Sequence, residues 1–220
     1  IALSEVNAEL ARTKANMLGI EKSYGDYKEL LADPEVQIVH ICTPNHLHYE
    51  IAKEAIAAGK NVVCEKPLAM NTEEGKELVE LADESGLICA MHLNCRAYPM
   101  VQQIRQMVKK GELGTIYAVN GSYQQDWLFK ETDYSWRLEK QFSGESRAVA
   151  DIGTHWFDTV ETVTGLKTKK VCADFATFHK TRKKPLKFWS QAIMKMSRLI
   201  RKIMQPCLSN LTTARMGLLR

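Results

Sequence analysis

The sequence predicts an α/β fold in which a doubly wound parallel sheet is followed by part of an α+β domain with an antiparallel sheet. In residues 1–93, short apolar segments alternate with amphipathic helical segments, in the order strand, helix, strand, helix. The strand over residues 36–44 is apolar throughout apart from Gln37 and His40, which is typical of parallel strands covered on both faces. The alternation changes character after Asn94.

Each helix of the first part is marked by residues that start or stop helices. Asn7 is a suitable N-cap, Pro34 closes a short helix, and Gly59 and Gly86 stand where a helix C-terminus favours glycine. In chain order we expect a strand over residues 1–6, helices over 8–18 and 27–31, the strand over 36–44, a helix over 46–58, a strand over 61–67, a helix from Asn71 to Gly86, and a strand over 87–93.

The second part mixes helices with half-exposed strands. A helix over residues 98–110 carries its apolar side chains on one face, and a second helix over 149–164 ends at Gly165. Residues 115–128 and 169–180 alternate between apolar and polar, as antiparallel strands do. We therefore expect a boundary near Leu93 between one domain over residues 1–93 and a second, partial domain over 94–187.

The composition is that of an ordinary globular protein, with 45% hydrophobic and 25% charged residues in a chain of 220. No segment approaches the ~18 consecutive apolar residues of a membrane helix. The N-terminus has no signal-peptide pattern and does not begin with Met, so we expect that its start is missing. The six cysteines form no CxxC pair, and we expect a reducing, cytoplasmic setting.

The net charge of +4 is unevenly distributed. Residues 175–220 hold 11 basic and no acidic residues, which leaves 19 basic against 26 acidic residues in the rest of the chain. A basic tail on an acidic body is typical of nucleic-acid binding, which we keep as the less favoured interpretation. Residues 188–220 also lack strand alternation. Nucleotides that encode residues 203–214 can, in another reading frame, encode an alternating strand with an Asn-Gly turn. We therefore hypothesise that residues 188–220 are an out-of-frame translation.

In open parallel sheets, ligands bind beyond the carboxyl ends of the strands. The segment "NVVCEKP" therefore places Glu65 and Lys66 at a binding edge, where a lysine can contact a polar substrate or a cofactor. We expect Pro67 to be cis and to direct Lys66 into the site. The alternative is that Glu65 and Lys66 form a solvated ion pair on a loop.

The segment "ADIGTHWFD" places Asp151 and His155 four residues apart, on one face of a helix. Such a pair near a lysine can perform acid–base chemistry on a hydroxyl or carbonyl group. His155 would remove the hydroxyl proton and Asp151 would orient its ring; the alternative is a helix-terminal carboxylate beside a packed histidine. His46 and His48 form an H-x-H pair without a third ligand at suitable spacing, so we expect no metal site.

Together, "CTPNHLHYEIAKEAIAAGKNVVCEKPLAMNTEE" and "ADIGTHWFD" resemble the Gfo/Idh/MocA family of NAD(P)-dependent oxidoreductases, over residues 1 to about 187. The resemblance implies a dinucleotide-binding Rossmann domain over residues 1–93 and a partial α/β substrate domain with an open sheet over 94–187. It implies hydride transfer between NAD(P) and a secondary carbinol of a sugar or polyol. It also implies that full-length relatives are homo-oligomers. By this resemblance Lys66, Asp151 and His155 match the catalytic residues.

The resemblance also assigns binding residues. Those matching the cofactor side are Glu5, Thr43, Pro44, Asn45, His46, Glu65, Lys66, Trp136 and Arg137. Those matching the substrate side are Arg96 and Tyr98. Glu5 matches the acid that binds the adenosine ribose, and it favours NAD over NADP because a carboxylate repels a 2′-phosphate.

One part of the family pattern is absent. Nothing in the chain matches the G-x-G-x-x-G turn that binds the pyrophosphate, so we expect an incomplete Rossmann domain without its first βα unit. Two functional classes therefore stay open: an NAD(P)-dependent sugar or polyol dehydrogenase, and an inactive truncated remnant that binds no cofactor. Cofactor titration separates them, and we expect this chain to show no micromolar binding.

Overall fold

The structure, a computed structural model, describes residues 1–184. The hypothesis of an out-of-frame tail concerns residues outside the described part of the chain. The chain divides into two compact units: the first holds Ile1–Asn94 with Lys140–Asp151, and the second holds Cys95–Glu139 with the described residues from Ile152 onward. The expected domain boundaries stay predictions.

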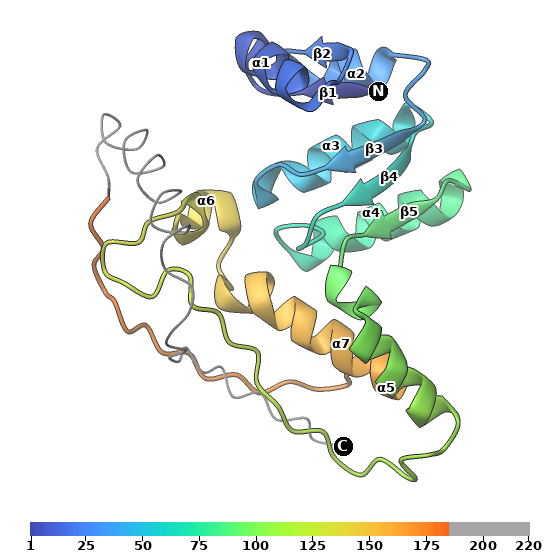
Figure 1. Ribbon diagram of the computed structural model, residues 1–220, viewed down its shortest axis with the longest axis vertical. Coiled ribbons are helices and arrows are strands. Elements are labelled where there is room, and N and C mark those ends of the chain that lie inside the picture. The colour runs from blue at the N-terminus through green and yellow to red at the C-terminus, as the bar shows by residue number, and fades with distance from the viewer. Residues whose placement is uncertain (185–220) are drawn as a thin grey trace. The chain divides into compact units, whose positions relative to one another are not determined.

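The first unit alternates strands and helices, as predicted (Figure 1). Its elements are β1 (Ala2–Ser4), α1 (Ala8–Leu18), β2 (Lys22–Tyr24), α2 (Tyr27–Ala32), β3 (Ile38–Ile41), α3 (His48–Ala57), β4 (Asn61–Cys64), α4 (Thr72–Ser85), β5 (Cys89–Met91) and α6 (Lys140–Ser143). All strand pairs are parallel, in one sheet of order β1-β2 and another of order β3-β4-β5. The predicted parallel α/β architecture is confirmed.

The sequence did not indicate two elements of the first unit, the short helix α6 and strand β2. Strand β2 has three residues and no apolar run, and its Lys22 and Tyr24 both direct their side chains to Asp33. The Lys22 Nζ and Tyr24 Oη atoms lie 2.8 and 2.9 Å from Asp33 Oδ2. A polar strand of this length gives no hydrophobic periodicity to detect.

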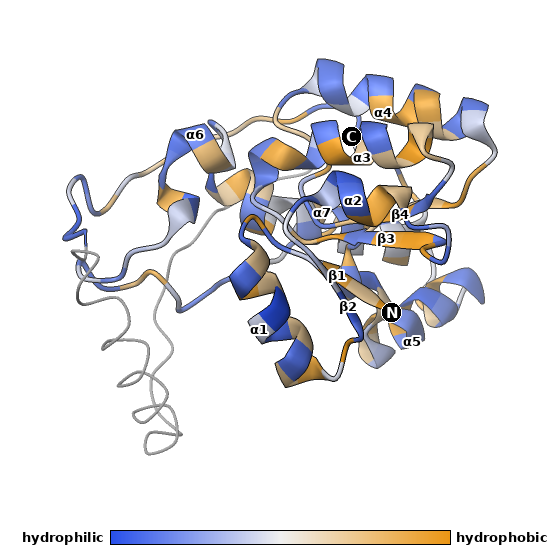
Figure 2. Cartoon of the chain, turned by 90° about the horizontal axis from the view of Figure 1, so that it is seen from above, coloured by the Kyte–Doolittle hydropathy of each residue, from blue (hydrophilic) through white to orange (hydrophobic). Residues whose placement is uncertain are grey.

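The start of α1 and the end of α4 lie where the capping residues predict. The Asn7 side chain accepts hydrogen bonds from the backbone N–H groups of Glu9 and Leu10, at 2.9 and 3.1 Å. Gly86 follows α4 with φ of 66°, a left-handed conformation that glycine adopts without steric cost. Polar and apolar positions alternate along α3 and α4, as the colours of Figure 2 show, so each helix has one side suited to burial.

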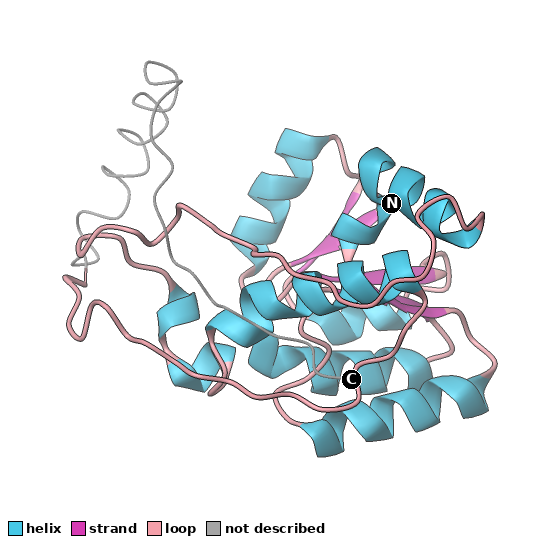
Figure 3. Cartoon of the chain, turned by 90° about the horizontal axis from the view of Figure 1, so that it is seen from below, coloured by secondary structure: helices cyan, strands magenta, loops and turns pink. Residues whose placement is uncertain are grey.

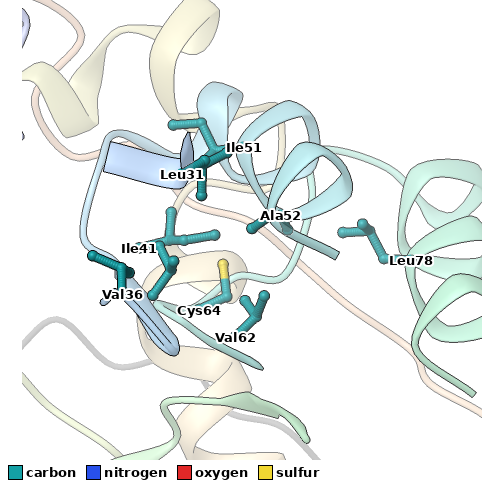
Figure 4. Close-up of a cluster of buried hydrophobic side chains, with 10 residues drawn as sticks. Leu31, Val36, Ile41, Ile51, Ala52, Val62, Cys64 and Leu78 are labelled. Atoms are coloured by element: carbon teal, nitrogen blue, oxygen red, sulfur yellow. The ribbon is translucent and has the colours of Figure 1, made fainter. Parts of the chain in front are cut away.

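The core of the first unit lies between the three-stranded sheet and its helices (Figure 4). Alternate residues of β3 and β4 point into it, and α3 and α4 cover them; the buried side chains are Leu31, Val36, Val39, Ile41, Ile51, Ala52, Ala55, Val62, Cys64 and Leu78. The opposite face of β3 is open, with Ile38 63% exposed and His40 also exposed. The expectation that this strand is covered on both faces is therefore wrong, since the helices after β3 and β4 pack on the same face.

The second unit contains the helices α5 (Pro99–Lys109) and α7 (Thr154–Thr164), which lie side by side (Figure 1). Among its described residues there is no strand, so the expected antiparallel strands over 115–128 and 169–180 are not found (Figure 3). Alternation favours an extended chain, but a strand also needs a backbone partner, and here Tyr117 and Phe178 remain 80% and 70% exposed.

Within residues 1–184, no helix combines the length and the apolar character needed to cross a membrane.

Candidate active site

Lys66 lies immediately after β4, at the carboxyl end of the parallel sheet, and its peptide bond to Pro67 is cis, as predicted. Its Nζ atom lies 2.6 Å from Oδ1 of Asp151 and 2.7 Å from the main-chain oxygen of the same residue. The two side chains are only 14% and 11% exposed. The structure thus joins two of the predicted catalytic residues, which are 85 positions apart in the sequence.

Arg147 completes a charged group around Asp151. Its Nη1 atom lies 2.9 Å from Oδ2 of Asp151, so that the two carboxylate oxygens bind two different cations. The group of Lys66, Asp151 and Arg147 therefore carries a net positive charge, which suits the stabilisation of a developing oxyanion. We did not predict Arg147, although its i,i+4 spacing from Asp151 is a signal that the sequence contains.

His48 joins the two loops that carry the site. It is fully buried, with Nδ1 2.7 Å from the Pro67 oxygen and Nε2 2.9 Å from the Thr43 oxygen. Both partners are main-chain carbonyl oxygens, one from each loop. The sequence predicted only that His48 lies in the helix over residues 46–58, but the side chain holds the loop after β3 against the loop after β4.

The loop after β3 contains buried polar atoms that fit a nucleotide cofactor. Thr43 Oγ1 and His46 Nδ1 are both buried, and neither has a hydrogen-bond partner among the described residues. Because buried polar atoms are normally paired, two such atoms at the carboxyl end of a parallel sheet favour a polar ligand there. Between them, Pro44 precedes a 3-10 turn, and the Asn45 side chain donates to the Ser143 oxygen at 3.3 Å.

The acidic residues predicted on the cofactor side both have protein partners. Glu5 follows β1 and binds Lys14, and Glu65 follows β4 with its Oε1 atom 2.6 Å from His92 Nδ1. Burial opposes ionisation of Glu65, but the hydrogen bond from His92 prevails and lowers the pKa of the carboxyl group. The assignment of Glu5 to a ribose stays a prediction.

His155 belongs to the second unit. It is 8% exposed and stacks on Tyr123, with ring centroids 6.0 Å apart and an interplanar angle of 17°. Burial raises the pKa of Tyr123 to about 12, and its hydroxyl lies 3.6 Å from Cys95 Sγ. The predicted helix over 149–164 is confirmed, although its first turn, Val149–Gly153, is π-helical. The catalytic role of His155 stays a prediction.

The other predicted residues also lie in the second unit. Arg96 binds Asp158 through both carboxylate oxygens, with Nε 3.0 Å from Oδ2, and this pairing raises the pKa of the guanidinium group. Arg137 lies over the Trp136 ring, 4.6 Å from its centroid. Tyr98 precedes α5 and is 50% exposed. The ligand contacts assigned to these residues stay predictions.

The sequence was compared with models of known protein families. The NAD-binding Rossmann domain of the Gfo/Idh/MocA oxidoreductases matches residues 1–93, and the family's C-terminal domain matches residues 101–199. The chain belongs to the Gfo/Idh/MocA oxidoreductase family. The second match extends 12 residues into the segment that we hypothesise to be out of frame, from residue 188 to residue 199.

Curated relatives include sugar oxidoreductases. Levoglucosan dehydrogenase of Pseudarthrobacter phenanthrenivorans is 37% identical over 164 residues, which are 74% of this chain and 42% of the relative. The NADP-dependent D-xylose 1-dehydrogenase of Hypocrea jecorina is 32% identical over 140 residues, which are 61% of this chain and 35% of the relative. The chain thus spans less than half the length of these two relatives.

Solved structures of oxidoreductases share the fold. An oxidoreductase domain protein from Kribbella flavida superposes with a TM-score of 0.79 at 34% identity, over 84% of this chain and 49% of that protein. Levoglucosan dehydrogenase in complex with NADH and levoglucosan gives a TM-score of 0.78 at 34% identity, over 82% of this chain and 48% of that protein.

Proposed function

We propose that the site at the carboxyl ends of β3 and β4 supports NAD(P)-dependent oxidation of a sugar or polyol at a secondary carbinol. The observation that carries the proposal is the ion pair of Lys66 with Asp151, in which a largely buried ammonium group is fixed at the edge where such sheets bind ligands. The levoglucosan and xylose dehydrogenases among the relatives favour a sugar as the substrate.

The charged group explains how the chain would stabilise the reaction. Asp151 accepts two of the hydrogen bonds that the Lys66 ammonium can donate, which leaves one donor for a substrate oxygen. The net positive charge with Arg147 favours that oxygen as its negative charge develops. The role of His155 as the group that removes the hydroxyl proton rests on the family resemblance alone.

The residues for the cofactor are those of the two loops. Thr43, His46 and the adjacent Asn45 would contact a nicotinamide nucleotide on its ribose side, and His48 would keep their loop in place. The bound nicotinamide would supply the acceptor for the hydride. No residue of this chain is assigned to the pyrophosphate, so we expect weaker cofactor binding than in a relative with a glycine-rich turn.

The test is substrate-dependent reduction of NAD or NADP by the 220-residue chain at millimolar cofactor, with levoglucosan and D-xylose in the panel of sugars. We expect slow reduction with at least one sugar and its loss in Lys66→Met, while Lys76→Met, which removes a 78% exposed lysine of α4, retains it. No reduction with any sugar, or equal rates in the Lys66→Met variant, would refute the proposal and favour the inactive remnant.

A further inference from the structure

The face of the three-stranded sheet that points away from the core carries two histidines and a carboxylate. Strand register aligns His40 with Val63, and Cys64 with Met91. Glu65 follows Cys64 and His92 follows Met91. The sheet hydrogen bonding continues through these two residues, because the Glu65 N–H donates to the Ile41 oxygen and the His92 N–H donates to the Cys64 oxygen. Because side chains alternate between the two faces of a sheet, His40, Glu65 and His92 share the face opposite the core.

The three side chains converge closely enough to bind one ion. One potential ligand atom from each lies within 4.8 Å of the other two, and Glu65 Oε1 is 2.6 Å from His92 Nδ1. The rings of His40 and His92 meet edge to face, with centroids 5.4 Å apart. The Glu65 and His92 side chains are 33% and 43% exposed and His40 is exposed, so an ion can reach them from solvent.

We propose that His40, Glu65 and His92 form a binding site for a divalent transition metal of the zinc type. Two imidazoles and one carboxylate are a ligand set that zinc sites use, with water in the remaining position. Magnesium and calcium prefer oxygen ligands throughout, so this set disfavours them. Zn–N distances of ~2.1 Å place the ligand atoms of a tetrahedral site about 3.4 Å from one another. The three ligand atoms here lie within 4.8 Å of one another, and rotation of the partly exposed side chains can bring them to that separation.

This site is absent from the sequence-based expectations, which considered only His46 and His48 as histidine ligands and concluded that no metal binds. His48 is instead occupied by two carbonyl oxygens. A metal bound to Glu65 would replace its hydrogen bond with His92 and would connect the ends of β3, β4 and β5 through side chains. The inference does not depend on the proposed oxidoreductase activity, because metal binding is measured without substrate or cofactor.

The experiment is titration of the 220-residue chain with Co²⁺, followed by visible absorption, and with Zn²⁺, followed by calorimetry. The decisive variant is His40→Gln, since His40 is exposed and its loss leaves the core intact. The matched control is His179→Gln, which removes an exposed histidine of the second unit. Circular dichroism of each variant establishes that it is folded.

We expect one metal ion to bind the chain, with affinity at least about tenfold lower in His40→Gln and His92→Gln and unchanged in His179→Gln. We also expect Zn²⁺ to raise the urea midpoint of the unaltered chain more than that of His40→Gln, because binding to the folded state alone stabilises it. Equal affinities of the unaltered chain and the His40→Gln variant would overturn the proposal. So would a thiolate-to-cobalt absorption band that disappears in Cys42→Ser, since it would assign the metal to a cysteine.

Discussion

Replacement of Asp151 by Ala should destabilise the first unit more than any surface charge substitution. Asp151 accepts hydrogen bonds from Lys66 at 2.6 Å and from Arg147 at 2.9 Å, so its removal leaves two neighbouring cations without their shared carboxylate. Removing one partner of a buried ion pair costs about 3–5 kcal/mol of unfolding free energy. Lys66 keeps the main-chain oxygen of residue 151 as an acceptor, and Arg147 is 32% exposed, so we expect the low end of that range.

The assay is urea unfolding followed by circular dichroism at a helix wavelength, with the unfolding free energy taken from the midpoint and slope. The control is Glu80→Gln on α4, whose 3.8 Å pair with Lys76 is solvent-exposed and should contribute less than about 1 kcal/mol. The double variant Lys66→Met, Asp151→Ala should lose less than the sum of the two single losses, because the pair is then removed together. A loss below 1 kcal/mol for Asp151→Ala, or strict additivity, would refute the description of this pair as buried and coupled.

Three further predictions concern the scaffold of the first unit. The hydrogen bond from Lys22 lowers the pKa of Asp33 from 3.8 to about 2, so the stability it contributes is present above pH 4 and lost as the pH falls towards 2. Urea midpoints should therefore fall less steeply between pH 4 and 2 in Asp33→Asn, and identical slopes would contradict this. Ile41→Ala removes a core side chain that is 2% exposed and should cost about 2–5 kcal/mol in urea unfolding, whereas Ile38→Ala, on the open face, should cost under 1; equal losses would argue against the assigned core. Asn71→Ala removes the acceptor of the Glu74 N–H at 2.9 Å and should cost about 1 kcal/mol in the same assay, with Asn71→Asp restoring the cap.

Much of the first unit could be predicted because its signals are local. The cap at Asn7 and the glycine at position 86 act on their own helices, so the bounds of α1 and α4 follow from a few adjacent residues. Strand β2 could not be found in this way, since it has no apolar periodicity and its polar side chains bind Asp33, nine and eleven positions further along the chain. The prediction of strands over residues 115–128 and 169–180 was wrong for a different reason. These segments do alternate between apolar and polar residues, but alternation cannot show whether a partner strand is present.

The candidate site was predictable only where the sequence carries a specific motif. Lys66 and Asp151 are 85 positions apart in the sequence. Periodicity cannot predict a contact between residues so far apart, whereas the family resemblance assigns both residues to one site. Arg147 had an i,i+4 signal that could have been used. His92 could have been found by extending strand alternation one residue past β5, whereas the two carbonyl partners of His48 depend on loop geometry that no local pattern encodes.

The most direct test of the central claim, that Lys66 and Asp151 belong to a site for hydride transfer from a carbinol, is the fate of the carbinol hydrogen. A sugar that the chain oxidises is supplied with deuterium at the carbon that loses its hydrogen, and the reduced cofactor is analysed by mass spectrometry. We predict one deuterium in the reduced nicotinamide with the unaltered chain and with Lys76→Met. With Lys66→Met we predict that no reduced nicotinamide forms. Reduced cofactor without deuterium, or the same labelled product with Lys66→Met, would contradict the assignment.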